Sequence, residues 1–272
     1  MDLKWILVMV VGFVAAMVGM NKQKSGAAWG QILAIVGAVI AVAGAAMNLT
    51  GFFRAGSQSR DRENRYMYLQ ARILADHLKE ATNAKKVAVI CDSSIFLDEW
   101  GDPLPKPRAN PWLDAVKDAF KGAEVVPVYK KFKIKKPANE QAGMMMPPPM
   151  AFGMMSGADW KKIVDEVKKA KPDVIVNIHT FPQEGKLPAA LALLKGYKIG
   201  FLNSCSNDEL RFAFKDGGKA MAEVLAVVMT KSDAKYDDTI PSSDKKAFAR
   251  RFVLVTKDNY EAGMKEASKG GR

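Results

Sequence analysis

The sequence predicts an α/β protein with an amino-terminal two-helix transmembrane hairpin and one doubly wound domain built on a mainly parallel, five-stranded sheet. Two apolar segments, Trp5–Met20 and Ala27–Phe53, contain no charged residue. Short runs of β-branched residues then alternate with amphipathic helical patterns, which is typical of parallel sheets covered by helices. The 272-residue chain leaves about 190 residues beyond the hairpin and its linker, enough for one domain with its own core.

The first 53 residues are predicted to form the transmembrane hairpin. A hydrocarbon core about 30 Å thick needs about 20 apolar residues in a helix, and Ala27–Phe53 exceeds that length. Trp5–Met20 would reach only about 24 Å, so it spans with the help of flanking residues. A signal peptide is the alternative for this first segment, but no small-x-small cleavage site precedes Asn21, and we therefore favour the hairpin.

Both apolar segments carry small residues at the spacing of one helix face. Small residues let helix backbones approach closely in lipid. The two readings left open are a hairpin that packs on itself and a hairpin that docks into a larger membrane assembly. The residues concerned are Gly12, Ala16, Gly19, Gly30, Ala34, Gly37, Ala41 and Gly44.

The distribution of basic residues predicts the orientation in the membrane. Five of them flank the outer ends of the hairpin and two lie in its loop: Lys4, Arg54, Arg60, Arg62 and Arg65 against Lys22 and Lys24. Basic residues concentrate on the cytoplasmic side of membranes. We therefore expect a two-pass protein of the cell (inner) membrane, with the large domain in the cytoplasm rather than the periplasm.

The composition restricts the partners and cofactors. The formal net charge of +12 favours attraction to an anionic lipid surface, and no nucleic-acid-binding motif is present, so no nucleic acid partner is expected. With only Cys91, Cys205, His77 and His179 available, neither a disulfide framework nor a usual metal site can be assembled. No nucleotide-binding glycine motif follows the first strand. We expect no metal and no cofactor.

The rest of the chain divides into a juxtamembrane linker and helix, residues 54–84, and an α/β domain, residues 85–272. Residues 54–65 read as a polar linker and residues 66–82 as an amphipathic helix. The predicted strands are residues 86–91, 124–129, 173–178, 198–203 and 252–256, and the predicted helices are residues 111–121, 158–170, 187–194 and 216–230. Pro127 cannot donate to a sheet ladder, which places the second strand at an edge. The Lys-rich run 129–136 fits an edge that deters unwanted pairing, with an anion-binding patch as the alternative.

A Met/Pro-rich loop, residues 143–157, interrupts this alternation. It contains six of the fifteen methionines and three consecutive prolines, which exclude a helix there. Methionine side chains adapt to irregular surfaces, so we favour docking onto a partner subunit or the membrane over Cu(I) binding. The docking residues predicted are Met144, Met145, Met146, Met150, Phe152, Met154 and Met155.

Polar residues follow the carboxyl ends of three predicted strands, where open α/β sheets bind their ligands. They are Asp92 and Ser93 after the first strand, Asn177 and His179 at the third, and Asn203, Ser204 and Cys205 at the fourth. Each could instead serve only to cap a turn or to satisfy buried backbone groups. Cys205 could act as a nucleophile with His179 as its base, but no further catalytic motif supports an enzyme.

Three fragments of the domain resemble type I periplasmic sugar-binding proteins. They are Asn110–Lys117 (NPWLDAVK), Lys215–Ala222 (KDGGKAMA) and Phe252–Asn259 (FVLVTKDN). This resemblance implies that the domain is one lobe of that two-lobed fold. A flavodoxin-like domain is the alternative for the same doubly wound sheet. It also implies that Asn110 and Trp112 join Asp92 near a ligand rim, and it favours an extracytoplasmic location, against the charge pattern.

Three functions follow in order of preference. The first is a non-enzymatic accessory or scaffold subunit of a larger membrane assembly, or a homo-oligomer, that carries a binding-protein-like lobe. The second is a membrane-tethered protein that binds or senses a small, sugar-like ligand. The third is a hydrolase or transferase that uses Cys205 and His179.

Overall fold

The computed structural model describes residues 3–134, 155–182, 187–202, 207–216, 220–236 and 239–269. The chain forms two compact units, Met1–Glu63 and Asn64–Arg272. The first contains helix α1 (Leu3–Lys24) and the beginning of helix α2 (Ala28–Thr82). The second contains the end of α2 and the α/β domain.

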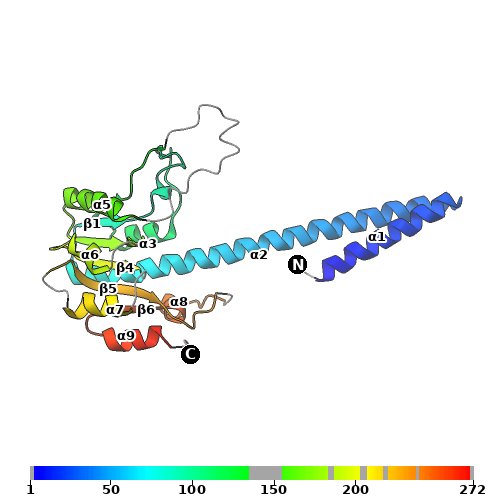
Figure 1. Cartoon of the computed structure of the whole chain (residues 1–272). Helices are drawn as coiled ribbons and strands as arrows, with labels where there is room; N and C mark the ends of the chain where they lie inside the picture. Colours follow the sequence, from blue (N-terminus) through cyan, green and yellow to red (C-terminus); the bar gives the residue numbers. More distant parts are fainter. Residues whose placement is uncertain are drawn as a thin grey trace. The chain divides into compact units, whose positions relative to one another are not determined.

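The first unit is an antiparallel helical hairpin (Figure 1). Gly26 adopts a positive φ of 83° in the turn, a conformation in which glycine carries no Cβ penalty. Residues Ile6–Lys24 and Ala28–Met47 are long and apolar enough to cross a membrane. Their apolar side chains are mostly exposed, as with Ile32 and Val42 at 66% and 68%. The hairpin thus presents an apolar outer surface.

The predicted small residues bring the two helices of the hairpin together. A Cβ added at Gly12 would lie 2.8 Å from the carbonyl oxygen of Gly37, and one at Gly19 would lie 2.8 Å from that of Gly30. Backbone therefore meets backbone along this seam, as small residues permit. The further contacts involve Ala16, Ala34 and Ala41, and Gly44 faces Met9. The hairpin packs on itself; docking into a larger assembly stays a prediction.

Helix α2 is continuous through residues 54–65, which the sequence analysis assigned to a polar linker. That stretch contains four Arg, one Gln and one Glu, and these residue types are good helix formers that need no apolar stripe. The boundary between the units falls after Glu63, inside the helix, rather than at the predicted residues 53 and 84. The predicted helix 66–82 is confirmed as the end of α2.

Within the described residues, the sheet of the second unit has six strands in the order β2-β1-β3-β4-β5-β6. The strands are β1 (Lys86–Ile90), β2 (Glu124–Val128), β3 (Val174–Asn177), β4 (Lys198–Leu202), β5 (Glu223–Thr230) and β6 (Phe252–Thr256). The first five run parallel in the order 2-1-3-4-5, which is the order of flavodoxin-like doubly wound sheets. Strand β6 is antiparallel to β5, so the sheet is mixed.

The prediction of five strands was wrong because β5 was assigned to a helix over residues 216–230. Its sequence EVLAVVMT is apolar at nearly every position, and such runs show neither helical nor strand periodicity. The segment lies between β4 and β6 and is largely buried, which explains why it lacks alternating polar residues. The edge position of Pro127 is confirmed, since β2 ends the sheet.

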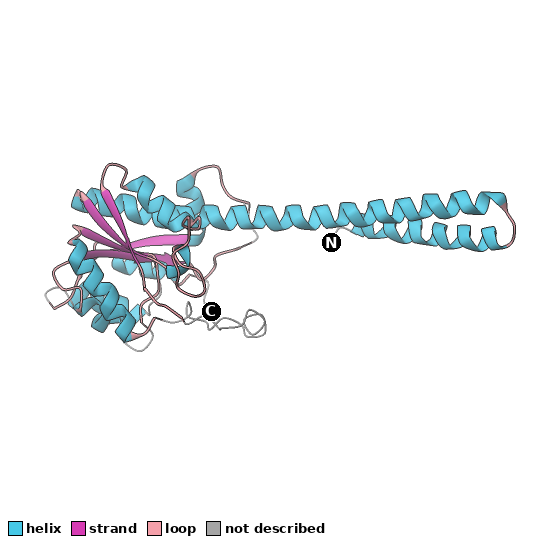
Figure 2. Cartoon of the chain, turned by 90° about the horizontal axis from the view of Figure 1, so that it is seen from above, coloured by secondary structure: helices cyan, strands magenta, loops and turns pink. Residues whose placement is uncertain are grey.

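Helices cover both faces of the sheet (Figure 2). On one face lie α2, α3 (Pro111–Ala119) and α8 (Asp244–Arg251). On the other lie α5 (Gly157–Ala170), α6 (Leu187–Ala192) and α9 (Tyr260–Ala267). The predicted helices 111–121, 158–170 and 187–194 are therefore confirmed to within a few residues. Short helices α7 (Asn207–Arg211) and η2 (Phe212–Asp216) follow β4.

Helix α2 packs directly on the centre of the sheet through Gly200 of β4. A Cβ at this position would lie 2.7 Å from Leu78 Cδ1 and 3.0 Å from Leu74 Cδ1. Both leucines are fully buried, so the absence of a side chain at Gly200 admits the helix to this face. This contact fixes residues 66–82 of α2 as one wall of the domain.

Candidate functional site

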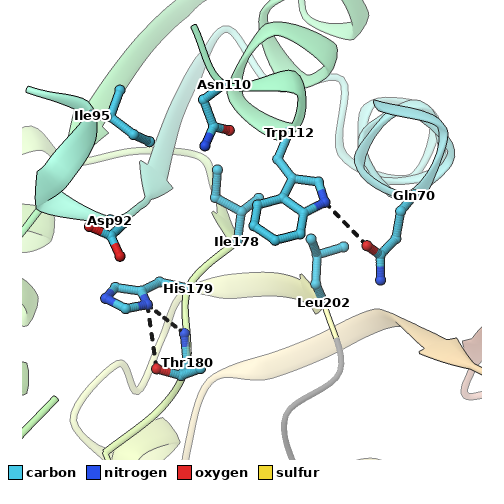
Figure 3. Close-up of a pocket in the computed structure, with 9 residues that line it drawn as sticks. All are labelled: Gln70, Asp92, Ile95, Asn110, Trp112, Ile178, His179, Thr180 and Leu202. Carbon is cyan, nitrogen blue, oxygen red and sulfur yellow. Dashed lines mark hydrogen bonds between the residues drawn. The ribbon is translucent and has the colours of Figure 1, made fainter. Parts of the chain in front are cut away.

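A cavity of about 210 Å³ opens beside the carboxyl ends of β1 and β3, between α2 and the start of α3 (Figure 3). It is lined by Gln70, Asp92, Ile95, Asn110, Trp112, Ile178, His179, Thr180 and Leu202. This is the edge of an open α/β sheet at which ligands bind. The lining combines a carboxylate, two amides, an imidazole, an indole and a hydroxyl with three aliphatic side chains.

Asp92 follows β1 and caps the short helix η1 (Ser93–Ile95). Its Oδ1 accepts the backbone N–H of Ser94 at 2.7 Å. Its other oxygen has no hydrogen-bond partner among the described residues. Figure 3 shows the carboxylate directed toward the His179 ring. The capping bond fixes this side chain and leaves one oxygen as an acceptor for a ligand.

His179 is held in one orientation by the segment after β3. Its backbone N–H is donated to Asn177 Oδ1 at 3.0 Å, and its Nδ1 accepts the N–H of Thr180 at 2.8 Å. Burial lowers the pKa of His179, an effect that Asp92 opposes and Lys130 reinforces. The ring is therefore neutral near pH 7, and because Nδ1 is an acceptor, its proton lies on Nε2.

The start of α3 provides two further groups. The side chain of Asn110 caps the helix by accepting the N–H of Leu113 at 3.0 Å. The indole Nε1 of Trp112 donates to Gln70 Oε1 on α2 at 3.2 Å. Asn110 therefore positions the first turn, and Gln70 holds the indole plane as one wall of the cavity (Figure 3).

The structure brings together four of the predicted ligand-binding residues, Asp92, Asn110, Trp112 and His179. Asn177 is fully buried and supports the backbone of His179, while Ser93 is buried and does not line the cavity. Asn203, Ser204 and Cys205 lie outside the described residues, as do Met144, Met145, Met146, Met150, Phe152 and Met154. Met155 is described and is 3% exposed in the core, so it offers no docking surface here.

Gln70 was not among the site residues predicted from the sequence. This residue lies on the buried side of α2, one turn from Tyr66 and one turn from Leu74. A polar residue within an apolar helical stripe is the signal that could have revealed it, because glutamine is seldom buried without a partner. The aliphatic lining residues carried no such signal, since they read simply as core.

Neither a metal site nor a catalytic pair occurs within the described part of the chain. No cluster of three metal-ligating side chains is found there. Cys91 is fully buried at the end of β1 and its thiol donates to the carbonyl of Val128 at 3.7 Å. Burial raises the pKa of Cys91 to about 12, so the thiolate needed for nucleophilic attack does not form.

Comparisons with known proteins identify neither a family nor a function. No protein-family model matches the chain, and neither does any curated protein. Among solved structures the chain is similar to an extracellular ligand-binding receptor from Verminephrobacter eiseniae ef01-2, with 14% identity and a TM-score of 0.35. The match covers 74% of this chain and 43% of the receptor, so this chain spans less than half of the receptor's length. The case for a function therefore rests on the cavity.

Proposed function

We propose that the chain is a membrane-anchored protein that binds a small ligand in the cavity beside β1 and β3. One observation carries this proposal: Asp92, Asn110, Trp112 and His179 come from three separate segments and line the same cavity. Polar groups that converge on a partly apolar cavity at this edge of the sheet are the usual features of a ligand site.

The lining favours a small, neutral ligand rich in hydroxyl groups, such as a monosaccharide. Asp92 offers an acceptor, and His179 offers a donor at Nε2. A hydroxyl group can donate and accept at once, which suits such a mixed lining. The indole of Trp112 offers an apolar face for the C–H side of a sugar ring. The cavity of about 210 Å³ is below the usual range for drug-sized ligands.

The hairpin serves as the anchor in this proposal. Its helices are long enough to span a bilayer. Their exposed apolar side chains are more stable in contact with lipid than with water. Location of the domain on the cytoplasmic side follows only from the flanking basic residues. A periplasmic location fits the resemblance to sugar-binding proteins, so protease protection in sealed vesicles is the decisive measurement for sidedness.

The accessory-subunit hypothesis now has less support than ligand binding. It relied on two surfaces, the small-residue stripes and the Met/Pro-rich loop. The stripes are used within the hairpin itself, and of the loop only residues 155–157 are described. The cavity, in contrast, is built from described residues alone.

The proposal is tested by thermal unfolding of the full chain in mild detergent with D-glucose, D-galactose and D-ribose in turn. At least one sugar should raise the Tm of the wild type by mass action. The substitutions Asp92→Asn and Trp112→Ala should abolish the shift. Asp114→Asn is the matched control, because Asp114 is exposed on α3 and does not line the cavity. The proposal fails if no sugar shifts the Tm, or if Asp92→Asn responds like the wild type.

A further inference from the structure

We infer that Gln70 is a ligand-contact residue and that a bound ligand ties α2 to the start of α3. This inference rests on the proposed function, because it concerns the same cavity. It adds a binding group from outside the strand ends, on the helix whose earlier residues form the apolar segment Ala28–Met47.

Among the described residues, only the oxygen of the Gln70 side-chain amide has a hydrogen-bond partner. Gln70 is 9% exposed, and this oxygen accepts the indole N–H of Trp112. Its amide nitrogen has no hydrogen-bond partner among the described residues, although it belongs to a residue of the cavity wall. Figure 3 shows the oxygen directed at Trp112 and the nitrogen pointing away from it. The amide nitrogen is not one of the buried, unsatisfied side-chain atoms of the described residues, so it is open to water. Because Gln70 lines the cavity, a ligand hydroxyl would take the place of that water as the acceptor.

The position of Gln70 links ligand binding to one contact between helices. Side-chain hydrogen bonds of the described residues join α2 to α3 or its end: Tyr68 Oη to Asp118 Oδ2 at 2.8 Å, Trp112 Nε1 to Gln70 Oε1 at 3.2 Å, and Lys79 Nζ to the carbonyl of Ala119 at 2.8 Å. The second of these is the longest and lies on the cavity wall. A ligand bound by both Gln70 and Asp92 would bridge α2 and the end of β1. This bridge would hold α2 in place together with the Trp112–Gln70 hydrogen bond.

The consequence is that α2 responds to the occupancy of the cavity. A ligand that contacts residues on both sides stabilises the docked helix over its locally opened form, since it binds the first better than the second. Residues 66–78 of α2 should therefore open less often when the ligand is bound. No change of backbone structure is needed for this response.

Hydrogen–deuterium exchange of the full chain in detergent tests the inference, with D-glucose, D-galactose and D-ribose as probes. In the wild type, a sugar that raises the Tm should slow amide exchange in residues 66–78 several-fold. Gln70→Glu keeps an acceptor for Trp112 and removes the amide donor. It should weaken binding of that sugar about tenfold and abolish the slowing. Gln70→Met removes both groups and should show the same losses.

Tyr68→Phe is the matched control, because it removes a different hydrogen bond between the same two helices and does not alter the cavity wall. It should leave both sugar binding and the ligand-induced slowing intact. If the Gln70 variants bind a sugar with wild-type affinity, or if their α2 exchange slows equally, the inference is wrong while the proposed function stands. If no sugar binds the wild type, the proposed function itself has failed.

Discussion

The guanidinium group of Arg251 stacks on the ring of Tyr66, with Cζ 3.6 Å from the ring centroid. Both side chains are 1% exposed. The ring of Tyr236 lies 4.8 Å from the same carbon. This contact joins α2, just after the unit boundary, to the end of α8. A planar cation between aromatic rings replaces part of the hydration that Arg251 lost on burial.

Replacement of Arg251 by alanine should destabilise the domain by about 2–4 kcal/mol, through loss of the cation–π contact and creation of a cavity. Chemical denaturation followed by circular dichroism measures this difference. Arg251→Lys should also destabilise, since an ammonium group cannot stack as the flat guanidinium does. Lys246→Met, on the exposed side of α8, serves as the control. A stable Arg251→Lys variant would show that charge alone suffices.

Bulky residues on the glycine seam should open the hairpin. At Gly37 even a Cβ would lie 2.4 Å from the backbone nitrogen of Ala16, so Gly37→Leu must separate the helices. We expect this substitution to destabilise the packed hairpin by about 1–3 kcal/mol. Limited proteolysis should then cleave the interhelical loop faster, and engineered cysteine pairs across the seam should no longer cross-link. Val42→Leu, on the exposed side of the same helix, should have no effect. Equal behaviour of the two variants would contradict the packing described.

Acid should weaken the domain partly through His179. Because burial lowers its pKa in the folded state below the unfolded value of 6.5, the unfolded chain binds the proton more readily. The stability that this neutral side chain contributes is therefore complete above about pH 6.5 and is lost as the pH falls from there toward the folded pKa. His179→Gln should flatten this part of the stability curve, measured by denaturant unfolding at several pH values.

His77→Asn is the control for that experiment, since His77 is the other histidine of the chain and lies outside the cavity. In the folded protein His179 takes up its proton only as the pH falls through its lowered pKa. Protonation removes the acceptor of the Thr180 N–H, so sugar binding should weaken at that lower pH. A pH profile that His179→Gln leaves unchanged would show that other groups determine the acid response.

The thiol of Cys91 should be unreactive in the folded protein. Its pKa of about 12 and its complete burial leave almost no accessible thiolate at pH 8. In a Cys205→Ser background, where Cys91 is the remaining cysteine, a disulfide reagent should modify no thiol under native conditions and one after unfolding. Rapid native modification would show that the end of β1 opens to solvent.

Much of the fold could be predicted because most strands carry their own signal. The β-branched runs of β1, β3 and β6 and the proline of β2 are local features. Strand β5 was missed because helices cover both faces of the sheet, so its side chains are buried on both sides and show no polar periodicity. The continuity of α2 was missed because its middle is polar and has no apolar face to reveal the helix.

The candidate site could be predicted in the same partial way. The strand-end rule identified Asp92 and His179, and the likeness to binding proteins added Asn110 and Trp112. Gln70 could not be predicted as a lining residue, because its position in the cavity wall depends on how α2 packs across Gly200 and against α3. No pattern along the chain encodes that crossing.

Because the end of α2 forms part of the domain core, the choice of the first residue matters for expression. Truncation at the predicted domain start, residue 85, would delete Tyr66, Leu74 and Leu78 from the core, together with Gln70. The freed face of β4 at Gly200 would then be exposed to water. A soluble version for crystallisation or ligand screening should begin at or before Asn64, and one that begins at Lys85 should aggregate.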